Sequence, residues 1–135
     1  MSRAQQRLQL VRYWWANAEE SIASARRELE ASAYGYALNR LYYAAFYGAS
    51  AALLERGISF KRHAGVRSAF HEHFIKTGLL DKKHGDIYDK LFEDRHHADY
   101  EAFASFDRRH VLSRLEGCLQ LLEQLRPLIS SLSQT

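Results

Sequence analysis

The feature of this sequence that most constrains its fold is the scarcity of residues that interrupt helices. Proline occurs once, at Pro127, and seven glycines are spread over 135 residues. Proline breaks a helix interior and glycine favours a helix end, so most glycines are expected where helices stop. Strand-like alternation of apolar and polar residues is nearly absent. The chain is therefore predicted to be all-α, an antiparallel helical bundle of about five helices with four main helices and a shorter one.

Apolar residues that recur at spacings of three and four predict the first two helices. The first is expected from about residue 3 to residue 31, with Ser2 as its cap. The second is expected over 34–55 and is apolar on nearly every side, so it should lie at the centre of the bundle. Gly57 is placed to end it.

The same reasoning predicts the remaining helices. A third helix over about 64–76 should stop at Gly78. A fourth should start at Asp81, which can cap it, and should run up to a loop over 98–106. Asp107 is a good cap for the last helix. The aromatic residues of the loop are expected to order it, and they are Tyr100, Phe103 and Phe106.

Length and composition predict one cored domain over residues 1–135, because 47% hydrophobic and 26% charged residues are an ordinary globular balance. The sequence shows no signal peptide, and its apolar runs are too short to cross a bilayer. We therefore expect a cytoplasmic protein without a membrane partner. The lone cysteine, Cys118, excludes an internal disulfide and a multi-cysteine zinc site, and its leucine neighbours predict a buried thiol.

Charge is distributed unevenly along the chain. Residues 1–67 carry ten Lys and Arg against five acids, whereas residues 68–135 carry nine against eleven. The first half is therefore the expected home of a phosphate-bearing partner. The net charge of +3 is nevertheless small for a dedicated nucleic-acid binder.

Seven histidines raise the hypothesis of a metal site, but their spacing argues against it. The clusters are His71 with His73 and the adjacent pair His96 and His97. Residues one or two apart on a helix point away from each other, whereas two ligands of one metal need a spacing of three or four. Nucleophile-elbow, Walker and dinucleotide motifs are absent as well. We therefore expect neither a metal nor a cofactor.

Two segments place polar side chains on helices that are otherwise apolar. On the expected central helix, Asn39, Tyr43 and Tyr47 share a face by steps of four and can line a groove; the alternative is a core helix with satisfied hydroxyls. Near the end of the fourth helix, Arg95 and Asp99 are four apart and can form an ion pair. That pair either ties down the next loop or places Arg95 to hold a phosphate beside a histidine or tyrosine.

Four segments, taken in order, resemble the HEPN family. They are Ala-Leu-Asn-Arg-Leu-Tyr-Tyr-Ala-Ala-Phe (37–46), Lys-Arg-His-Ala-Gly-Val (61–66), Phe-Ile-Lys-Thr-Gly-Leu-Leu (74–80) and the stretch from Arg95 to Tyr100. The last segment is similar to the branch whose motif reads Arg-x-x-x-Asp-Tyr. The resemblance spans about residues 15–126, which is nearly the whole chain.

The resemblance implies a homodimer whose interprotomer cleft, lined by the motif near Arg95, binds RNA or a nucleotide. Many family members are metal-independent ribonucleases, and many form a toxin–antitoxin pair with a minimal nucleotidyltransferase. The ribonucleases carry an arginine followed four to six residues later by a histidine. In this chain Asp99 and Tyr100 stand after Arg95 where that histidine is expected.

Three hypotheses follow from the resemblance. The first is a ribonuclease toxin, in which Arg95 stabilises phosphate charge and His96 or His97 moves the proton. In that toxin Asp99 orients a histidine or Arg95, and Tyr100 positions the ribose or base. In a non-catalytic binding subunit the same groups hold a nucleotide or partner, and six more residues help: Asn39, Arg40, Tyr43, Lys61, Arg62 and His63. The third hypothesis is a purely structural dimerisation module. The family also makes Tyr100 a candidate acceptor of a nucleotidyl group.

Overall fold

The computed structural model describes residues 1–58 and 63–133, and this part of the chain contains helices and no strand. Its five α-helices are α1 (Arg3–Glu30), α2 (Tyr34–Glu55), α3 (His63–Phe70), α4 (Lys82–Tyr100) and α5 (Arg108–Leu125). A π-helix (His71–Ile75) continues α3, and two 3₁₀ turns (Arg126–Leu128 and Ser130–Ser133) follow α5. The all-α prediction is confirmed.

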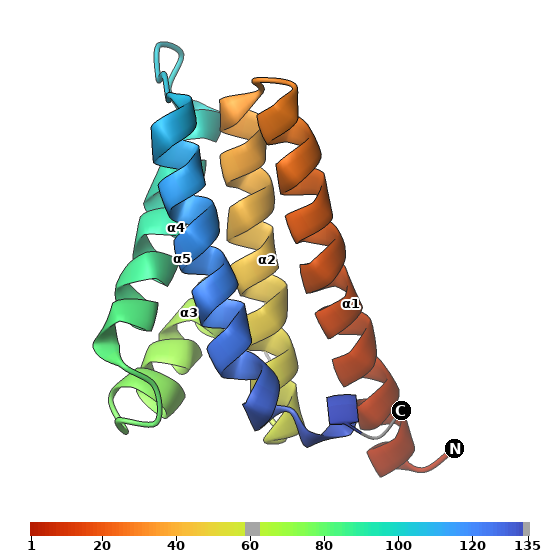
Figure 1. Cartoon of the computed structure of the whole chain (residues 1–135). Helices are drawn as coiled ribbons and strands as arrows, with labels where there is room; N and C mark the ends of the chain where they lie inside the picture. Colours follow the sequence, from red (N-terminus) through yellow and green to blue (C-terminus); the bar gives the residue numbers. More distant parts are fainter. Residues whose placement is uncertain (59–62, 134–135) are drawn as a thin grey trace.

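Helix α2 is the centre of the bundle, as its apolar sequence predicted. It contacts α1, α3, α4 and α5, and Figure 1 shows it between α1 and the pair formed by α4 and α5. Helices α1 and α2 run antiparallel, and so do α4 and α5. The start of α1 and the last 3₁₀ turn lie at the end of the bundle where α2 finishes.

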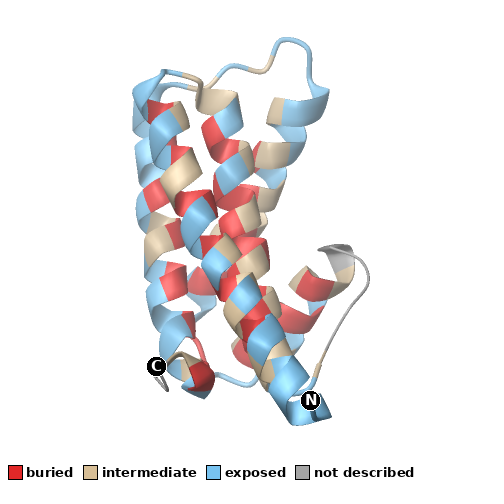
Figure 2. Cartoon of the chain, turned by 90° about the vertical axis from the view of Figure 1, so that its right-hand side faces the viewer, coloured by how far each residue is buried: buried red, intermediate tan, exposed pale blue. Residues whose placement is uncertain are grey.

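The core is built around α2 because that helix buries residues on nearly every side. Its buried residues include six alanines and a glycine beside the large side chains, which lets neighbouring helices approach closely. Full burial of one large apolar side chain contributes about 1.5–3 kcal/mol. On the outer helices the buried residues form a stripe and the outward side is exposed, as Figure 2 shows. The largest fully buried side chains of α2 are Leu38, Leu41, Tyr42 and Leu53.

All three predicted helix caps are present. Ser2 Oγ accepts a hydrogen bond from the Gln5 backbone at 3.1 Å, and Gln5 Oε1 accepts one from the Ser2 backbone at 2.8 Å. Asp81 caps α4 through the backbone N–H of Lys83 at 2.9 Å. Asp107 caps α5 in the same way. Each cap satisfies donors that a helix start leaves unpaired.

Only two glycines end helices in the predicted manner. Gly57 and Gly78 adopt φ angles of 82° and 77°, the left-handed region that glycine tolerates. The expectation that most glycines mark helix ends is wrong, because the other five lie inside helices: Gly35, Gly48, Gly65, Gly85 and Gly117.

Several of these internal glycines are needed for close packing between helices. A methyl group at Gly117 of α5 would lie 2.6 Å from Cδ1 of Ile87 on α4. A methyl group at Gly48 of α2 would lie 2.5 Å from Cδ2 of Leu122 on α5. These glycines let the helices approach, which local periodicity does not reveal.

The boundary of α4 is the main correction to the predicted fold. The helix continues through 98–100, which were expected to belong to a loop, and the backbone N–H of Glu101 still bonds to His97 O. The loop is not ordered by all three aromatics, because Phe103 is 98% exposed and Tyr100 is exposed as well. Phe106 does pack against the core.

Two further features bear on the sequence predictions. Cys118 is buried as predicted, and burial raises the pKa of its thiol to about 12. Among the described residues, no helix combines the length and the apolar character that crossing a membrane requires.

We predict that Gly117→Ala destabilises the protein relative to Gly35→Ala. Both changes replace a helical glycine, but only Gly117 lies in a helix interior, where alanine alone would gain about 1 kcal/mol of helix propensity. The methyl at position 117 meets Ile87 at 2.6 Å, whereas the methyl at position 35 meets only Ala98 Cβ at 3.6 Å. The difference in the free energy of unfolding, measured with urea, should be about 1–3 kcal/mol from overpacking. Equal stabilities would contradict this packing.

Candidate functional site

The polar residues predicted on α2 and α4 meet in the structure. Asn39 Nδ2 of α2 donates to the Asp99 carboxylate of α4, at 3.3 Å from Oδ2 and 3.5 Å from Oδ1. Arg95 Nε lies 3.1 Å from Asp99 Oδ2, which confirms the predicted ion pair. Asp99 is thus held by one group from each helix. We call Asn39, Tyr43, Arg95 and Asp99 the Arg95 cluster.

Two tyrosines of α2 fix the Arg95 side chain. Arg95 Nη2 donates to the Tyr43 hydroxyl at 3.4 Å. The guanidinium carbon lies 5.0 Å from the centre of the Tyr42 ring and 5.4 Å from that of Tyr43. Aromatic faces attract a guanidinium, so the rings restrict its motion. Burial raises the pKa of Tyr42, against the opposing effect of the Arg95 charge.

The Arg95 cluster is partly shielded from water yet accessible. The Arg95 and Asp99 side chains are 21% and 28% exposed. Asn39 Oδ1 and Arg95 Nε are buried and have no hydrogen-bond partner among the described residues, because the Nε contact to Asp99 is close but not aligned. A buried polar atom without a partner costs about 1–3 kcal/mol. Such atoms are often found at functional sites.

The two adjacent histidines point in different directions. The His96 ring lies 5.0 Å from the Tyr100 ring, one turn further along α4. His97 Nδ1 lies 2.7 Å from Glu101 Oε1. Successive residues are about 100° apart around a helix, so His97 is turned well away from Arg95. His96 is therefore the imidazole on the side nearer to Arg95.

The predicted binding residues are only partly brought together. Asn39 and Tyr43 belong to the Arg95 cluster, and the exposed Arg40 places its guanidinium 5.7 Å from the centre of the Tyr43 ring. Lys61 and Arg62 lie outside the described residues, and so does the side chain of His63.

A buried carboxylate that sequence reasoning missed anchors this end of α4. Asp94 is buried, accepts a hydrogen bond from Arg114 Nε at 2.7 Å and lies 2.9 Å from His110 Nε2. Both partners belong to α5, so α5 holds the turn of α4 that carries Arg95. The sequence contained a signal, because Asp94 follows Leu91 by three residues in the apolar register of α4.

His71, in the π-helix that continues α3, pairs with a carboxylate of α4. Arg67 Nη1 donates to Asp89 Oδ1 at 2.8 Å, and His71 Nε2 lies 2.9 Å from the same oxygen. This pairing attaches α3 and the π-helix to α4. Among the described residues, no three His, Cys, Asp or Glu side chains are grouped so that they could hold a metal ion.

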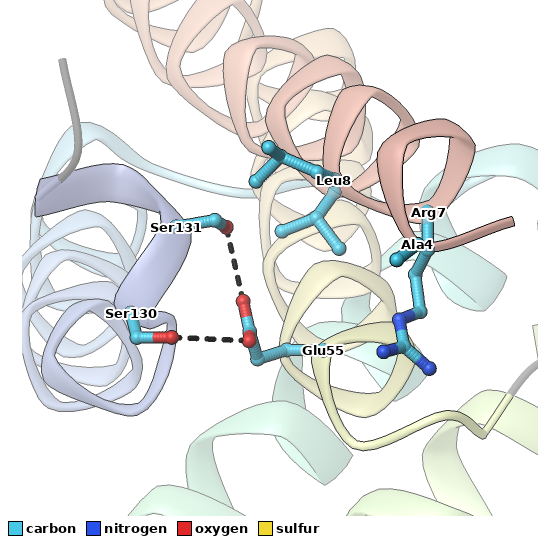
Figure 3. Close-up of a pocket in the computed structure, with 7 residues that line it drawn as sticks. Ala4, Arg7, Leu8, Glu55, Ser130 and Ser131 are labelled. Carbon is cyan, nitrogen blue, oxygen red and sulfur yellow. Dashed lines mark hydrogen bonds between the residues drawn. The ribbon is translucent and has the colours of Figure 1, made fainter. Parts of the chain in front are cut away.

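A separate hollow lies near the chain termini, between the start of α1, the end of α2 and the last 3₁₀ turn (Figure 3). The Glu55 carboxylate there accepts hydrogen bonds from Ser130 Oγ at 3.1 Å and Ser131 Oγ at 2.9 Å. Glu55 follows Asn39 by sixteen residues, or about 24 Å along α2. The hollow is thus remote from the Arg95 cluster.

The protein is an all-α bundle with a polar site between α2 and α4. Helix α4 ends in an Arg-x-x-x-Asp-Tyr motif, and this end of the helix packs against the tyrosine-rich central helix α2. The profile of the HEPN domain matches residues 11–129. The chain belongs to the HEPN domain family.

Three relatives illustrate its place in this family. A UPF0332 protein of Thermotoga maritima is 38% identical over 119 residues, which cover 86% of this chain and 90% of that protein. A UPF0332 protein of Pyrococcus horikoshii is 30% identical over 115 residues, covering 85% of this chain and 70% of that protein. A Methanocaldococcus jannaschii protein named "Putative toxin" is 37% identical over 91 residues, 62% of each chain.

We predict that Asp94→Ala destabilises the protein because it leaves Arg114 and His110 without their buried partner. The expected loss in the free energy of unfolding is about 1–3 kcal/mol, as for a hydrogen bond to a charged group. The control is Asp86→Ala, which removes an exposed carboxylate from the same helix and should change stability by about 0.5 kcal/mol or less. Urea unfolding measures both, and similar effects from the two variants would rule out an anchoring role for Asp94.

Proposed function

We propose that this HEPN protein is a toxin-like protein that binds RNA or a nucleotide at the Arg95 cluster, in a cleft between two copies of the chain. The observation that carries the proposal is the connection of Asn39, Arg95 and Asp99 across α2 and α4. It holds a guanidinium, a carboxylate and an amide together at a partly exposed position.

The chemistry of these groups suits a nucleotide. A guanidinium can donate two parallel hydrogen bonds to a phosphate, while the amide and the carboxylate can pair with a base edge or a ribose hydroxyl. Because Arg95 is already fixed by Asp99, Tyr42 and Tyr43, little side-chain freedom is lost on binding. The exposed Arg40 adds a second cation nearby.

A homodimer is part of the proposal because the Arg95 cluster stays partly open in one chain, where the Arg95 and Asp99 side chains are 21% and 28% exposed. Pairing by a two-fold axis would bring two copies of the cluster to one cleft. This arrangement is the one that the resemblance to the HEPN family implies.

The proposed toxin role is supported by the name of the Methanocaldococcus jannaschii relative. The proposed antitoxin is a minimal nucleotidyltransferase, as in the family branch with the Arg-x-x-x-Asp-Tyr motif. Tyr100 is exposed in the last turn of α4, where another protein can reach its hydroxyl.

Binding is favoured over cleavage by the way the charges are paired. Cleavage needs a cation free to stabilise phosphate charge and an imidazole that can move a proton. Arg95 faces Asp99, and His97 faces Glu101. The exposed His96 beside Tyr100 supports the second candidate function, a metal-independent ribonuclease in which His96 moves the proton of a ribose hydroxyl.

We predict that Arg95→Ala weakens RNA binding by about tenfold to a hundredfold, the factor for losing a charge-assisted hydrogen bond. The native protein and the variant are mixed with a labelled RNA pool in EDTA, and binding and cleavage are measured on the same samples. The control is Lys82→Ala, which removes an exposed cation from the opposite end of α4 and should leave binding unchanged.

The same experiment separates the two candidate functions. Intact RNA that is bound by the native protein and by Lys82→Ala supports a binding subunit. The ribonuclease is supported if the native protein and His97→Ala cleave RNA in EDTA while Arg95→Ala and His96→Ala do not. Equal binding by the native protein and Arg95→Ala would overturn the proposed function.

A further inference from the structure

A row of aromatic rings extends from the Arg95 cluster along the face shared by α1 and α2. Tyr13 and Trp14 of α1 have ring centres 5.3 Å apart, and Trp14 is stacked on Tyr47 of α2 at 5.5 Å with an interplanar angle of 18°. Tyr47 lies 5.9 Å from Tyr43, which belongs to the Arg95 cluster. We call Tyr13, Trp14, Tyr43 and Tyr47 the aromatic strip.

The aromatic strip is partly exposed rather than part of the core. Tyr13 is 58% exposed, while Trp14, Tyr43 and Tyr47 are half-buried and pack against the core. Trp14 and Tyr47 cover one face of each other, so a ligand would meet their outer edges and faces together with the exposed ring of Tyr13. Core packing explains the inner side of the strip, but it does not explain why the outer end is a tyrosine open to solvent.

Two arginine side chains lie at one end of the aromatic strip. The Arg40 guanidinium lies 5.7 Å from the centre of the Tyr43 ring, and that of Arg95 lies 5.4 Å from the same centre. Rings in series beside cations are the arrangement that binds single-stranded nucleic acid, because bases stack on the rings while arginines hold phosphates. A duplex does not offer its base faces in this way.

We propose, building on the proposed function, that the aromatic strip stacks the unpaired bases of a single-stranded RNA whose backbone is held at Arg40 and Arg95. The RNA then runs from the Arg95 cluster over Tyr43 and Tyr47 toward Tyr13. The substrate class of the site is therefore unpaired RNA rather than a duplex.

A protein partner fits the aromatic strip less well. A stable protein interface buries about 800 Å² on each partner, and three of the four rings are already half-buried against the core. Two arginines over one ring favour a polyanion. If a second copy of the chain covered this face instead, Tyr13→Ala would dissociate a dimer.

The fluorescence of Trp14 can report on base stacking in this test. The chain has two tryptophans, of which Trp15 is buried and Trp14 belongs to the aromatic strip. A base that stacks beside Trp14 should quench its fluorescence. The native protein is titrated with a short oligoadenylate and with the same strand annealed to oligouridylate, and Trp14→Phe is titrated in parallel.

The expected result has three parts. The single strand quenches the native protein more than the duplex does, and Trp14→Phe loses the quenching. Tyr13→Ala weakens oligoadenylate binding by about fivefold or more, the usual factor for one stacked base. The control Leu112→Ala, which truncates a 43% exposed apolar residue on α5, leaves the affinity unchanged. Both truncated side chains are exposed, so folding should be retained.

Three results would overturn the inference, and they differ in whether the proposed function fails with it. If the RNA binds and Arg95→Ala weakens it, but Trp14 is not quenched and Tyr13→Ala binds normally, the aromatic strip is not used and the proposed function stands. If neither the native protein nor any variant binds RNA, both proposals fail. If Tyr13→Ala instead dissociates a dimer in analytical ultracentrifugation, the strip is an interface between copies of the chain.

Discussion

The contact between the polar side chains of α2 and the end of α4 is the interaction on which the rest of the site depends. Helix α2 is surrounded by other helices, so Asn39 and the hydroxyl of Tyr43 must find partners within the bundle. Arg95 and Asp99 provide them. An ion pair at a spacing of four contributes only about 0.3–0.5 kcal/mol on a helix surface. The pair therefore serves mainly to orient groups that α2 and α5 hold in place.

Stability and the proposed recognition of RNA involve different sides of α4. Its inner side carries Tyr88 and Leu91, which are fully buried, and Asp94, which is tied to α5. Burial raises the pKa of Tyr88 well above its ordinary value, so this phenol stays neutral in the core. Arg95 and Asp99 lie at the boundary, and His96 and Tyr100 are exposed. A rigid inner side is what allows the outer side to present a fixed set of polar groups.

Much of the fold could be predicted because its signals are local. Periodicity identified the helices, Ser2, Asp81 and Asp107 were recognised as caps, and the four-residue spacing of Arg95 and Asp99 predicted their ion pair. The end of α4 was placed too early, and the contacts that were missed join distant residues. The Asn39–Asp99 bond joins residues 60 positions apart, and the role of Gly117 depends on Ile87 of another helix. Periodicity within one helix contains no information on such partners. It places Asp94 in the apolar register of α4, but it does not reveal that His110 and Arg114 of α5 pair with it.

If RNA lies on the Arg95 cluster and the adjoining face of α1 and α2, photo-crosslinking should attach it there. An oligonucleotide that contains 4-thiouridine is irradiated with the native protein, and the crosslinked residues are identified by mass spectrometry. The account predicts crosslinks at Tyr13, Tyr43, Tyr47 or Tyr100. Crosslinks confined to α5, or to the hollow beside Glu55, would contradict it.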